Sequence, residues 1–224
     1  MSETLADRWQ RVQHQVTSAC DDAGRSPDEV TTIVVTKFHP ASVVRELHSV
    51  GARHVGENRH QDAFPKHQEL TDLDLTWHFV GQLQSNKARA VAAYCDVIHS
   101  VDRASLVEAL GKYEGSVEVF LEVNLTLVPG RGGVEPGDLK ALAERTLEAG
   151  NLRLRGLMAV APQDEDPGQA FDRVLTYQED LLSVAPEATD LSLGMSGDFR
   201  EAIARGATHL RIGTAITGKR PLPA

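Results

Sequence analysis

The sequence has little cysteine and no long apolar run. Its two cysteines, Cys20 and Cys95, form no CxxC pair in the 224 residues, so no disulfide framework is indicated. No apolar stretch approaches the roughly 20 residues that a transmembrane helix needs. The N-terminus has no basic segment followed by an apolar one, so it does not look like a secretory signal. These absences favour a reduced, cytoplasmic protein without a membrane anchor.

Positive charge is scarce as well. The chain has 23 Lys and Arg against 32 Asp and Glu, which gives a formal net charge of -9. Nucleic-acid-binding proteins usually present a basic patch that displaces counterions from phosphates, and here the basic residues are spread thinly. We therefore expect no DNA, RNA or anionic membrane as a partner. An acidic protein can still bind a small anion where a few cations and backbone amides converge.

The remaining composition is that of an ordinary globular protein. Hydrophobic residues make up 41% of the chain and charged residues 25%, which excludes collagen-like, coiled-coil and disordered proteins. A single domain of this length buries about 70% of the surface that its unfolded chain exposes. No internal repeat or low-complexity linker divides the sequence, so we expect residues 1–224 to form one domain.

Apolar, β-branched segments alternate with amphipathic segments along the chain. Several apolar segments are continuous, which is typical of strands covered on both faces. Strands are predicted at residues 31–36, 54–56, 76–80, 97–99, 117–124, 154–160, 191–194 and 210–212. Apolar residues at spacings of three and four predict helices at 41–50, 59–68, 85–94, 103–113, 136–149, 167–184 and 197–205. A longer helix, over about residues 4–23, precedes the first strand.

This alternation predicts parallel β-α units, and eight of them without a domain break favour a (β/α)8 TIM-type barrel. The alternative is an open doubly wound sheet, but the first strand is not followed by the glycine-rich dinucleotide-binding turn of that fold. Only residues 213–224 follow the eighth strand, too few for a usual eighth helix. We expect the N-terminal helix to cover that part of the barrel wall.

Barrel active sites are built at the C-terminal ends of the strands. Lys37 directly follows the first predicted strand. A lysine held in a low-dielectric barrel mouth loses some of its preference for the charged form, and its neutral amine can form a Schiff base with a carbonyl compound. A lysine whose ammonium group reaches into solvent explains the same position. The residues alone leave both interpretations open.

The ends of the last two predicted strands are suited to a phosphate group. Met195 and Ser196 follow the seventh strand, Ser196 opening the next predicted helix, and Arg211, Gly213 and Thr214 stand at the end of the eighth. Barrels commonly bind phosphate at these two loops, through helix-terminal amides and hydroxyls. An ordinary helix cap also explains Ser196. A Schiff-base lysine together with a phosphate site indicates a phosphate ligand that bears an aldehyde.

Six ordered blocks of the sequence resemble the pyridoxal phosphate homeostasis protein family, the small single-domain relatives of the alanine racemase barrel. They are residues 35–37 (VTK), 55–58 (VGEN), 77–87 (WHFVGQLQSNK), 154–158 (LRGLM), 191–196 (LSLGMS) and 211–216 (RIGTAI). The resemblance covers nearly the whole chain after the first helix. Departures are small: Phe38-His39 follows the lysine, and Arg59 stands where other members carry tyrosine.

The resemblance implies a role for each candidate residue. Lys37 would carry pyridoxal 5′-phosphate (PLP) as a Schiff base, and Arg211 would face its pyridine nitrogen. The other residues would form the rest of the cofactor site: Ser196, Gly213 and Thr214 around the phosphate, with Met195 beside them, and Asn58 and His78 along the pocket. No catalytic residue and no metal ligand is expected.

The function implied by the resemblance is intracellular PLP homeostasis with little or no turnover. Apo-enzymes that use PLP are candidate recipients, and a monomer is expected. Two alternatives stay open: a PLP-dependent amino-acid racemase, and a class I aldolase-like barrel that uses Lys37 on a sugar phosphate. Racemases of this type supply a second acid/base from a tyrosine in an added β-domain, which we do not expect here, so His78 is the only candidate substitute. The segment 130–133 is expected to form a loop over the barrel mouth.

Overall fold

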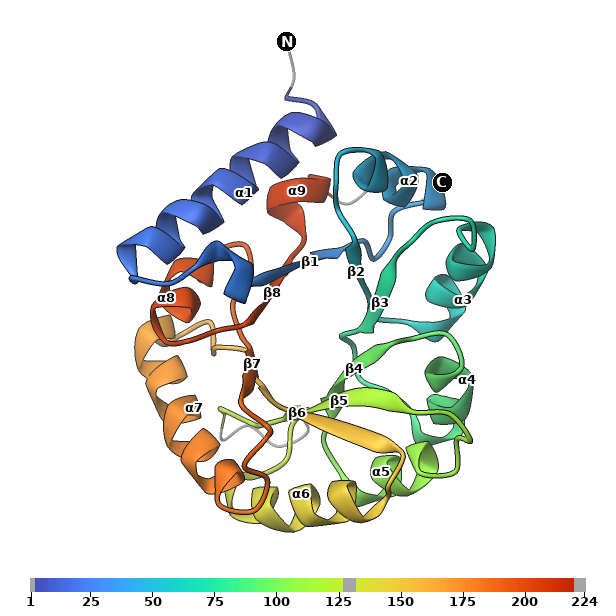
Figure 1. The fold of residues 1–224 in the computed structure, drawn as a ribbon, viewed down its shortest axis with the longest axis vertical. Coiled ribbons are helices and arrows are strands. Elements are labelled where there is room, and N and C mark those ends of the chain that lie inside the picture. The colour runs from blue at the N-terminus through green and yellow to red at the C-terminus, as the bar shows by residue number, and fades with distance from the viewer. Residues whose placement is uncertain (1–2, 127–131, 220–224) are drawn as a thin grey trace.

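The computed structural model describes residues 3–126 and 132–219. Its eight strands pair in parallel and in chain order, and β8 pairs with β1, so the sheet closes into the barrel of Figure 1. The strands are β1 (Thr31–Val35), β2 (His54–Glu57), β3 (Thr76–Phe79), β4 (Val97–Val101), β5 (Val117–Glu122), β6 (Leu152–Met158), β7 (Asp190–Ser192) and β8 (His209–Ile212). The predicted (β/α)8 barrel is confirmed.

Helices surround the barrel at the predicted places, with ends that differ by a few residues. They are α1 (Leu5–Asp22), α2 (Ala41–Ser49), α3 (His60–Glu69), α4 (Ala88–Ala92), α5 (Ala104–Leu110), α6 (Leu139–Glu148), α7 (Pro167–Leu182), α8 (Phe199–Ala204) and α9 (Thr214–Thr217). Short 3-10 turns precede β1 (Pro27–Glu29), α4 (Ser85–Lys87) and α6 (Pro136–Asp138). The helix predicted at 197–205 starts only at Phe199, so Ser196 lies in the turn before it.

The N-terminal helix completes the barrel wall, as predicted. α1 packs against α2, α8 and the four-residue α9, and it lies outside the β8–β1 seam in Figure 1. Thr4 caps it, because its hydroxyl accepts a hydrogen bond from Asp7 N at 3.1 Å and its own N–H donates to Asp7 Oδ2 at 2.9 Å. Arg8 Nε donates to Ile216 O at 2.6 Å, which joins α1 to α9.

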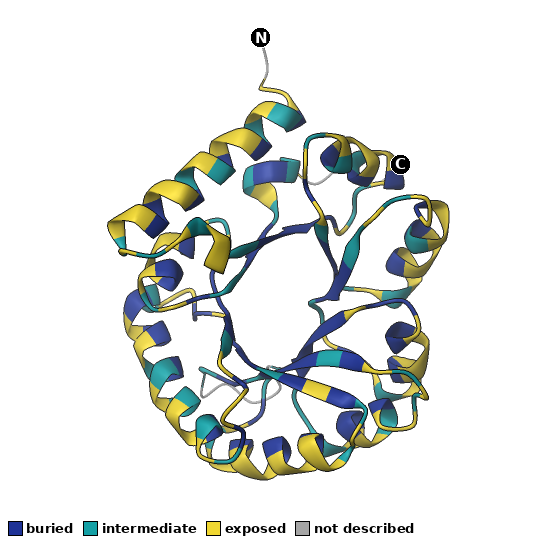
Figure 2. Ribbon diagram, in the orientation of Figure 1, coloured by how far each residue is buried: buried dark blue, intermediate teal, exposed yellow. Residues whose placement is uncertain are grey.

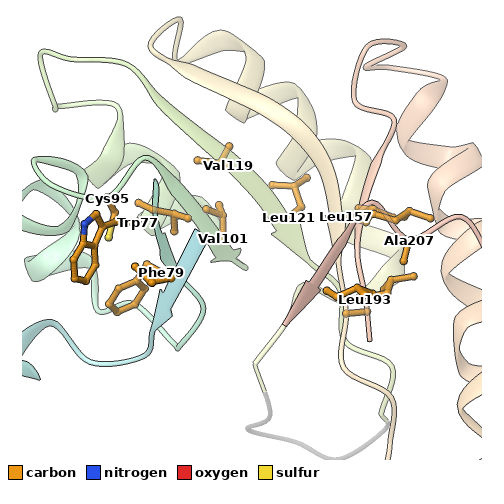
Figure 3. Packing of buried hydrophobic residues seen from close by; sticks show 14 of the residues in the cluster. Trp77, Phe79, Cys95, Val101, Val119, Leu121, Leu157, Leu193 and Ala207 are labelled. Atoms are coloured by element: carbon orange, nitrogen blue, oxygen red, sulfur yellow. The ribbon is translucent and has the colours of Figure 1, made fainter. Parts of the chain in front are cut away.

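The main apolar core lies between the barrel wall and the helices. In Figure 2 the helices are buried on the side that faces the strands and exposed on the outside. Figure 3 shows part of this layer, with Phe79, Val119 and Leu121 among its labelled side chains. Since successive strand residues point to opposite faces, Phe120 lies inside the barrel. There it forms a small separate cluster with Val97 and Met158.

The rest of the barrel interior is unusually polar. Barrels of this type are filled mainly by layers of branched apolar side chains. Here the rings of His99 and Phe120 stack with their centroids 4.6 Å apart, and His209 packs edge-on against Phe120 at 5.1 Å. His78 lies beside His99, with 5.1 Å between ring centroids. A layer of histidines therefore lies below the mouth of the barrel.

Candidate functional site

Three neighbouring strands bring the predicted phosphate-binding residues and the lysine to one side of the mouth. β8 pairs with both β1 and β7, so the turns after these strands are adjacent. Ser196 Oγ accepts hydrogen bonds from Ala215 N at 3.3 Å and from Thr214 Oγ1 at 3.5 Å. The two hydroxyls and the first turn of α9 therefore meet, next to the end of the strand that Lys37 follows.

The turn after β7 depends on a glycine. Gly194 has a φ of +82°, and a Cβ atom there would lie 2.8 Å from the Cβ of Ala202 in α8. Only glycine adopts this conformation without strain at such a close approach. The turn is closed by Met195 N, which donates to Asp198 Oδ1 at 2.5 Å. The side chain of Met195 is exposed beside Ser196.

Lys37 occupies the turn after β1, as expected, but its side chain is exposed. Of the two interpretations that the sequence left open, the exposed side chain agrees with a lysine whose ammonium group reaches into solvent. The cause is local: β1 ends at Val35, and residues 37 and 38 form a turn beyond it. In that turn Phe38 takes a φ of +69°, and the Arg59 guanidinium lies 5.7 Å from the centre of its ring.

A buried ion pair that sequence reasoning missed holds the peptide in front of Lys37. Lys66 of α3 forms an ion pair with Glu57, and its Nζ also donates to Thr36 O at 3.0 Å. Thr36 Oγ1 donates to Glu57 Oε1 at 2.7 Å. The Glu57 side chain is fully buried and that of Lys66 is 7% exposed. The sequence did contain a sign of this burial: Lys66 stands three residues after Ala63, so the two side chains lie on the same, buried face of α3.

Asn58 follows β2 and offers an unused acceptor. Its Oδ1 atom is buried and makes no hydrogen bond with the described residues. Its place is set by Gly81, where an added Cβ atom would lie 2.7 Å from both Cα and Cβ of Asn58. Because a buried polar atom without a partner costs free energy, this oxygen is suited to a donor group on a ligand.

Arg211 points into the barrel from β8. It is 5% exposed, and it donates to Ser192 O at 2.6 Å, Ser192 Oγ at 2.7 Å and Ala159 O at 2.9 Å. Burial lowers the pKa of Arg211 to about 10, so it stays a cation at neutral pH. All three hydrogen bonds end on uncharged oxygens, and a buried cation of this kind favours an anionic ligand.

His78 does not reach the rim. It lies inside β3, one inward-facing position below Val80, and is 1% exposed. Its Nε2 is 3.0 Å from His54 Nδ1, and its Nδ1 is 2.9 Å from His99 Nε2. Burial lowers the pKa of His78 well below the usual value. A neutral imidazole with both nitrogens engaged is not available as an acid at the mouth.

Glu122 is a further polar residue near Arg211 that the sequence did not single out. It ends β5. Burial raises the pKa of Glu122 to about 7, the charge of Asp102 adds to this, and the charge of Arg211 opposes it. The sequence could have indicated its inward position, because Glu122 stands two residues after Phe120 in the same strand and so points to the same face. This carboxyl group therefore changes its charge near neutral pH.

The segment predicted as a loop over the mouth is described only in part. Gly130 and Arg131 lie outside the described residues. Its far end is joined to β5, since Val134 N donates to Glu122 O at 2.7 Å and Asn124 N donates to Val134 O at 3.0 Å. Within the described ranges, no three His, Cys, Asp or Glu side chains are grouped as metal ligands, and no helix has the length and apolarity to cross a membrane.

Comparison with known proteins places these features in context. Residues 10–221 match the family described as alanine racemase, N-terminal domain. The chain is 42% identical over 221 residues to the pyridoxal phosphate homeostasis protein of Pseudomonas aeruginosa, covering 97% of this chain and 96% of that protein. PipY of Synechococcus elongatus, solved with PLP bound, is 38% identical with a TM-score of 0.83, covering 96% of this chain and 100% of PipY. An alanine racemase from Clostridium difficile is 10% identical with a TM-score of 0.71, covering 94% of this chain and 60% of the racemase, which shows a shared fold alone.

Proposed function

The chain belongs to the pyridoxal phosphate homeostasis proteins, a family with the alanine racemase N-terminal domain, and we propose that it binds PLP and serves the homeostasis of this cofactor. One observation carries the proposal: the lysine, the paired hydroxyls and the buried cation stand on three neighbouring strands. PLP bears an aldehyde, a phosphate and a pyridine ring on one small molecule. Each of these groups has a matching residue at this mouth.

The residues present fit the cofactor. Ser196 and Thr214, with the amide of Ala215, would hold the phosphate through hydroxyl and N–H donors. Arg211 would face the ring nitrogen, and the unpartnered Oδ1 of Asn58 would accept from a ligand donor. Gly213 is the N-cap residue of α9, so its backbone would lie beside the phosphate. The phosphate therefore meets donors, and the buried cation balances negative charge on the ligand.

Lys37 is the residue that we assign to the covalent bond with the aldehyde, a Schiff base. When bound, PLP supplies an electrophilic carbon and an electron-withdrawing ring. The Lys66–Glu57 pair holds the carbonyl of Thr36, so the backbone in front of Lys37 is fixed while its side chain is exposed. Met195 lies exposed beside the hydroxyls and offers an apolar contact.

We further propose that the protein turns over little or no substrate. A fixed positive charge from Arg211 beside the ring nitrogen disfavours a second one there, which weakens the ring as an electron sink. Both nitrogens of His78 are already engaged. The tyrosines do not replace it: Tyr94 packs among His60, Phe64 and His67 on the helix side of the wall.

The remaining two tyrosines also lie away from the mouth residues. Tyr113 follows α5, where its carbonyl accepts from Asn151 Nδ2 at 2.8 Å. Tyr177 lies within α7 and lines a cavity with Asn124 and Pro162, in the turns after β5 and β6, and not with the lysine or the paired hydroxyls. The second acid/base of a racemase therefore has no tyrosine to supply it at this site. A monomeric, cytoplasmic protein that delivers PLP to apo-enzymes completes the proposal.

Absorption spectroscopy and labelling test the function. Purified protein mixed with PLP should develop a visible or near-ultraviolet band, and borohydride reduction followed by peptide mass analysis should find the pyridoxyl group on Lys37. Lys37→Ala should abolish the band, whereas Lys112→Ala, at an exposed position after α5, should keep it. A label on Lys87 or Lys219, or no band in the unmodified protein, contradicts the assignment. Rapid α-proton exchange of amino acids in heavy water, with inversion, would establish a racemase instead.

A further inference from the structure

A continuous chain of hydrogen bonds crosses the barrel interior from β2 to Arg211. His54 Nδ1 lies 3.0 Å from His78 Nε2, and His78 Nδ1 lies 2.9 Å from His99 Nε2. His99 Nδ1 lies 2.8 Å from Ser192 Oγ, which accepts from Arg211 Nη1 at 2.7 Å. The links come from β2, β3, β4, β7 and β8, so residues far apart in sequence form one chain.

The chemistry of Arg211 gives this chain a single direction. A guanidinium only donates, so Ser192 Oγ accepts from it, and among the described residues the one partner left for the hydrogen of this hydroxyl is His99 Nδ1. His99 then carries its proton on Nε2 and donates to His78 Nδ1. His78 in turn carries its proton on Nε2 and donates to His54. All three histidines are therefore fixed as neutral Nε2–H tautomers.

Burial and packing keep the chain in this form. His78 is 1% exposed, and His99 and Ser192 are fully buried. Burial lowers the pKa of both histidines well below the usual value, and the charge of Arg211 adds to the effect on His99. The His99 ring is held flat against Phe120, with an angle of 8° between the ring planes. Along this hydrogen-bonded chain, the buried cation Arg211 is thus supported by neutral groups.

We propose that Ser192, His99, His78 and His54 form a positioning chain that fixes the guanidinium of Arg211 for the ring of the bound cofactor. The inference rests on the proposed PLP-binding function and adds to it residues that do not touch the cofactor. Ser192 is the central member, because its hydroxyl both accepts from Arg211 and donates to His99. The other two contacts of Arg211 are with backbone carbonyls, so this hydroxyl is the side-chain contact that orients it.

The first test needs no cofactor and no variant. Nitrogen-15 shifts of the histidine rings in the ligand-free protein report which nitrogen carries the proton. We expect the Nε2–H tautomer for His99, His78 and His54. Exposed His14 of α1, which is not part of the chain, serves as the reference ring. An Nδ1–H tautomer or a mixture at His99 or His78 in neutral solution would overturn the chain.

The second test measures what the chain does to the cofactor. In Ser192→Ala, Arg211 loses the side-chain hydrogen bond that orients it, so PLP should bind about tenfold more weakly and the absorption maximum of the bound cofactor should shift. Ser192→Thr, which keeps the hydroxyl, should restore the maximum, and His14→Gln should leave both quantities unchanged. A merely structural role would lower stability without moving the maximum of the cofactor that remains bound.

The outcomes separate the two proposals. If the unmodified protein gives no PLP band, the proposed function fails, while the ring shifts still decide whether the directional chain exists. If the unmodified protein binds PLP and Ser192→Ala binds it with the same affinity and maximum, the positioning role is wrong and the function stands. If Ser192→Ala does not fold, the tautomers of the unmodified protein keep the inference open to refutation.

Discussion

The interior histidines predict a specific loss of stability in acid, and His209 allows it to be measured at one residue. This side chain begins β8, lies partly buried against Phe120, and has its Nδ1 2.8 Å from Thr208 Oγ1. Burial lowers the pKa of His209 to about 4. An unfolded histidine titrates near 6.5, so between these values the unfolded chain binds the extra proton and the native chain does not. Stability at this residue therefore falls as the pH is lowered through this window.

The magnitude follows from the printed shift. Each pKa unit corresponds to about 1.36 kcal/mol, and from pH 7 to pH 5 the unfolded state gains about 2 kcal/mol from this one group. His78 and His99 act in the same direction, because burial lowers the pKa of each. Glu122 acts in the opposite direction, since burial raises its pKa to about 7 and the native state takes up its proton first. The total slope is thus a sum of opposing contributions.

The variant His209→Gln isolates the contribution of His209 to the loss of stability in acid. The free energy of unfolding in urea, followed by tryptophan fluorescence at pH 7 and pH 5, should fall by about 2 kcal/mol less in His209→Gln than in the unmodified protein. The other interior groups remain in both proteins, so their contributions cancel apart from the effect of the His209 charge on the pKa of His78 and His99. His14→Gln, at an exposed position, should follow the unmodified protein. Equal losses in His209→Gln and the unmodified protein would refute the assignment of this acid sensitivity.

Three further predictions concern the mouth. Lys66→Met leaves the buried carboxylate of Glu57 without its cation, so urea unfolding should show a loss of about 3–5 kcal/mol, and Lys112→Met at an exposed position should show almost none. Ser196→Ala should weaken PLP binding by roughly 1.5–3 kcal/mol in a spectroscopic titration, and pyridoxal without the phosphate should bind equally to both proteins. Gly81→Ala places a methyl group against Asn58 and should weaken PLP binding, whereas Gly137→Ala, where the added Cβ atom has open space, should leave binding unchanged.

The sequence was sufficient to predict the barrel because its elements are local. Each strand is a short apolar segment and each helix has a spacing of three and four, and parallel order follows from their alternation. The position of the mouth residues follows from the same rule, since Lys37, Ser196 and Thr214 come directly after strands. Their meeting depends only on the closure of the barrel between β8 and β1.

The histidines of the barrel interior and the Lys66–Glu57 pair next to Lys37 were harder to predict, because their positions depend on how distant segments pair and pack. His78 and His99 sit in strands whose inward faces are set by pairing partners more than 20 residues away, such as Gly56 opposite His78. A one-residue change in register would turn each histidine outward. The Lys66–Glu57 pair likewise joins a helix to a strand, and its burial is a tertiary property. The exposure of Lys37 depends on a turn whose geometry includes a positive φ at Phe38.

The polar interior also explains how an acidic chain holds an anionic cofactor. The formal net charge is -9, whereas the groups described below the mouth include Arg211, neutral imidazoles and Glu122, whose carboxyl group has a pKa of about 7. In a region of low dielectric, a guanidinium without a salt bridge attracts an anion far more strongly than an exposed one does, and this attraction is strongest while Glu122 is protonated. The neutral histidines satisfy its supporting serine without adding a negative charge that would cancel this attraction. His78 and His99, whose burial lowers the stability of the protein in acid, thus also support Arg211 without neutralising its positive charge.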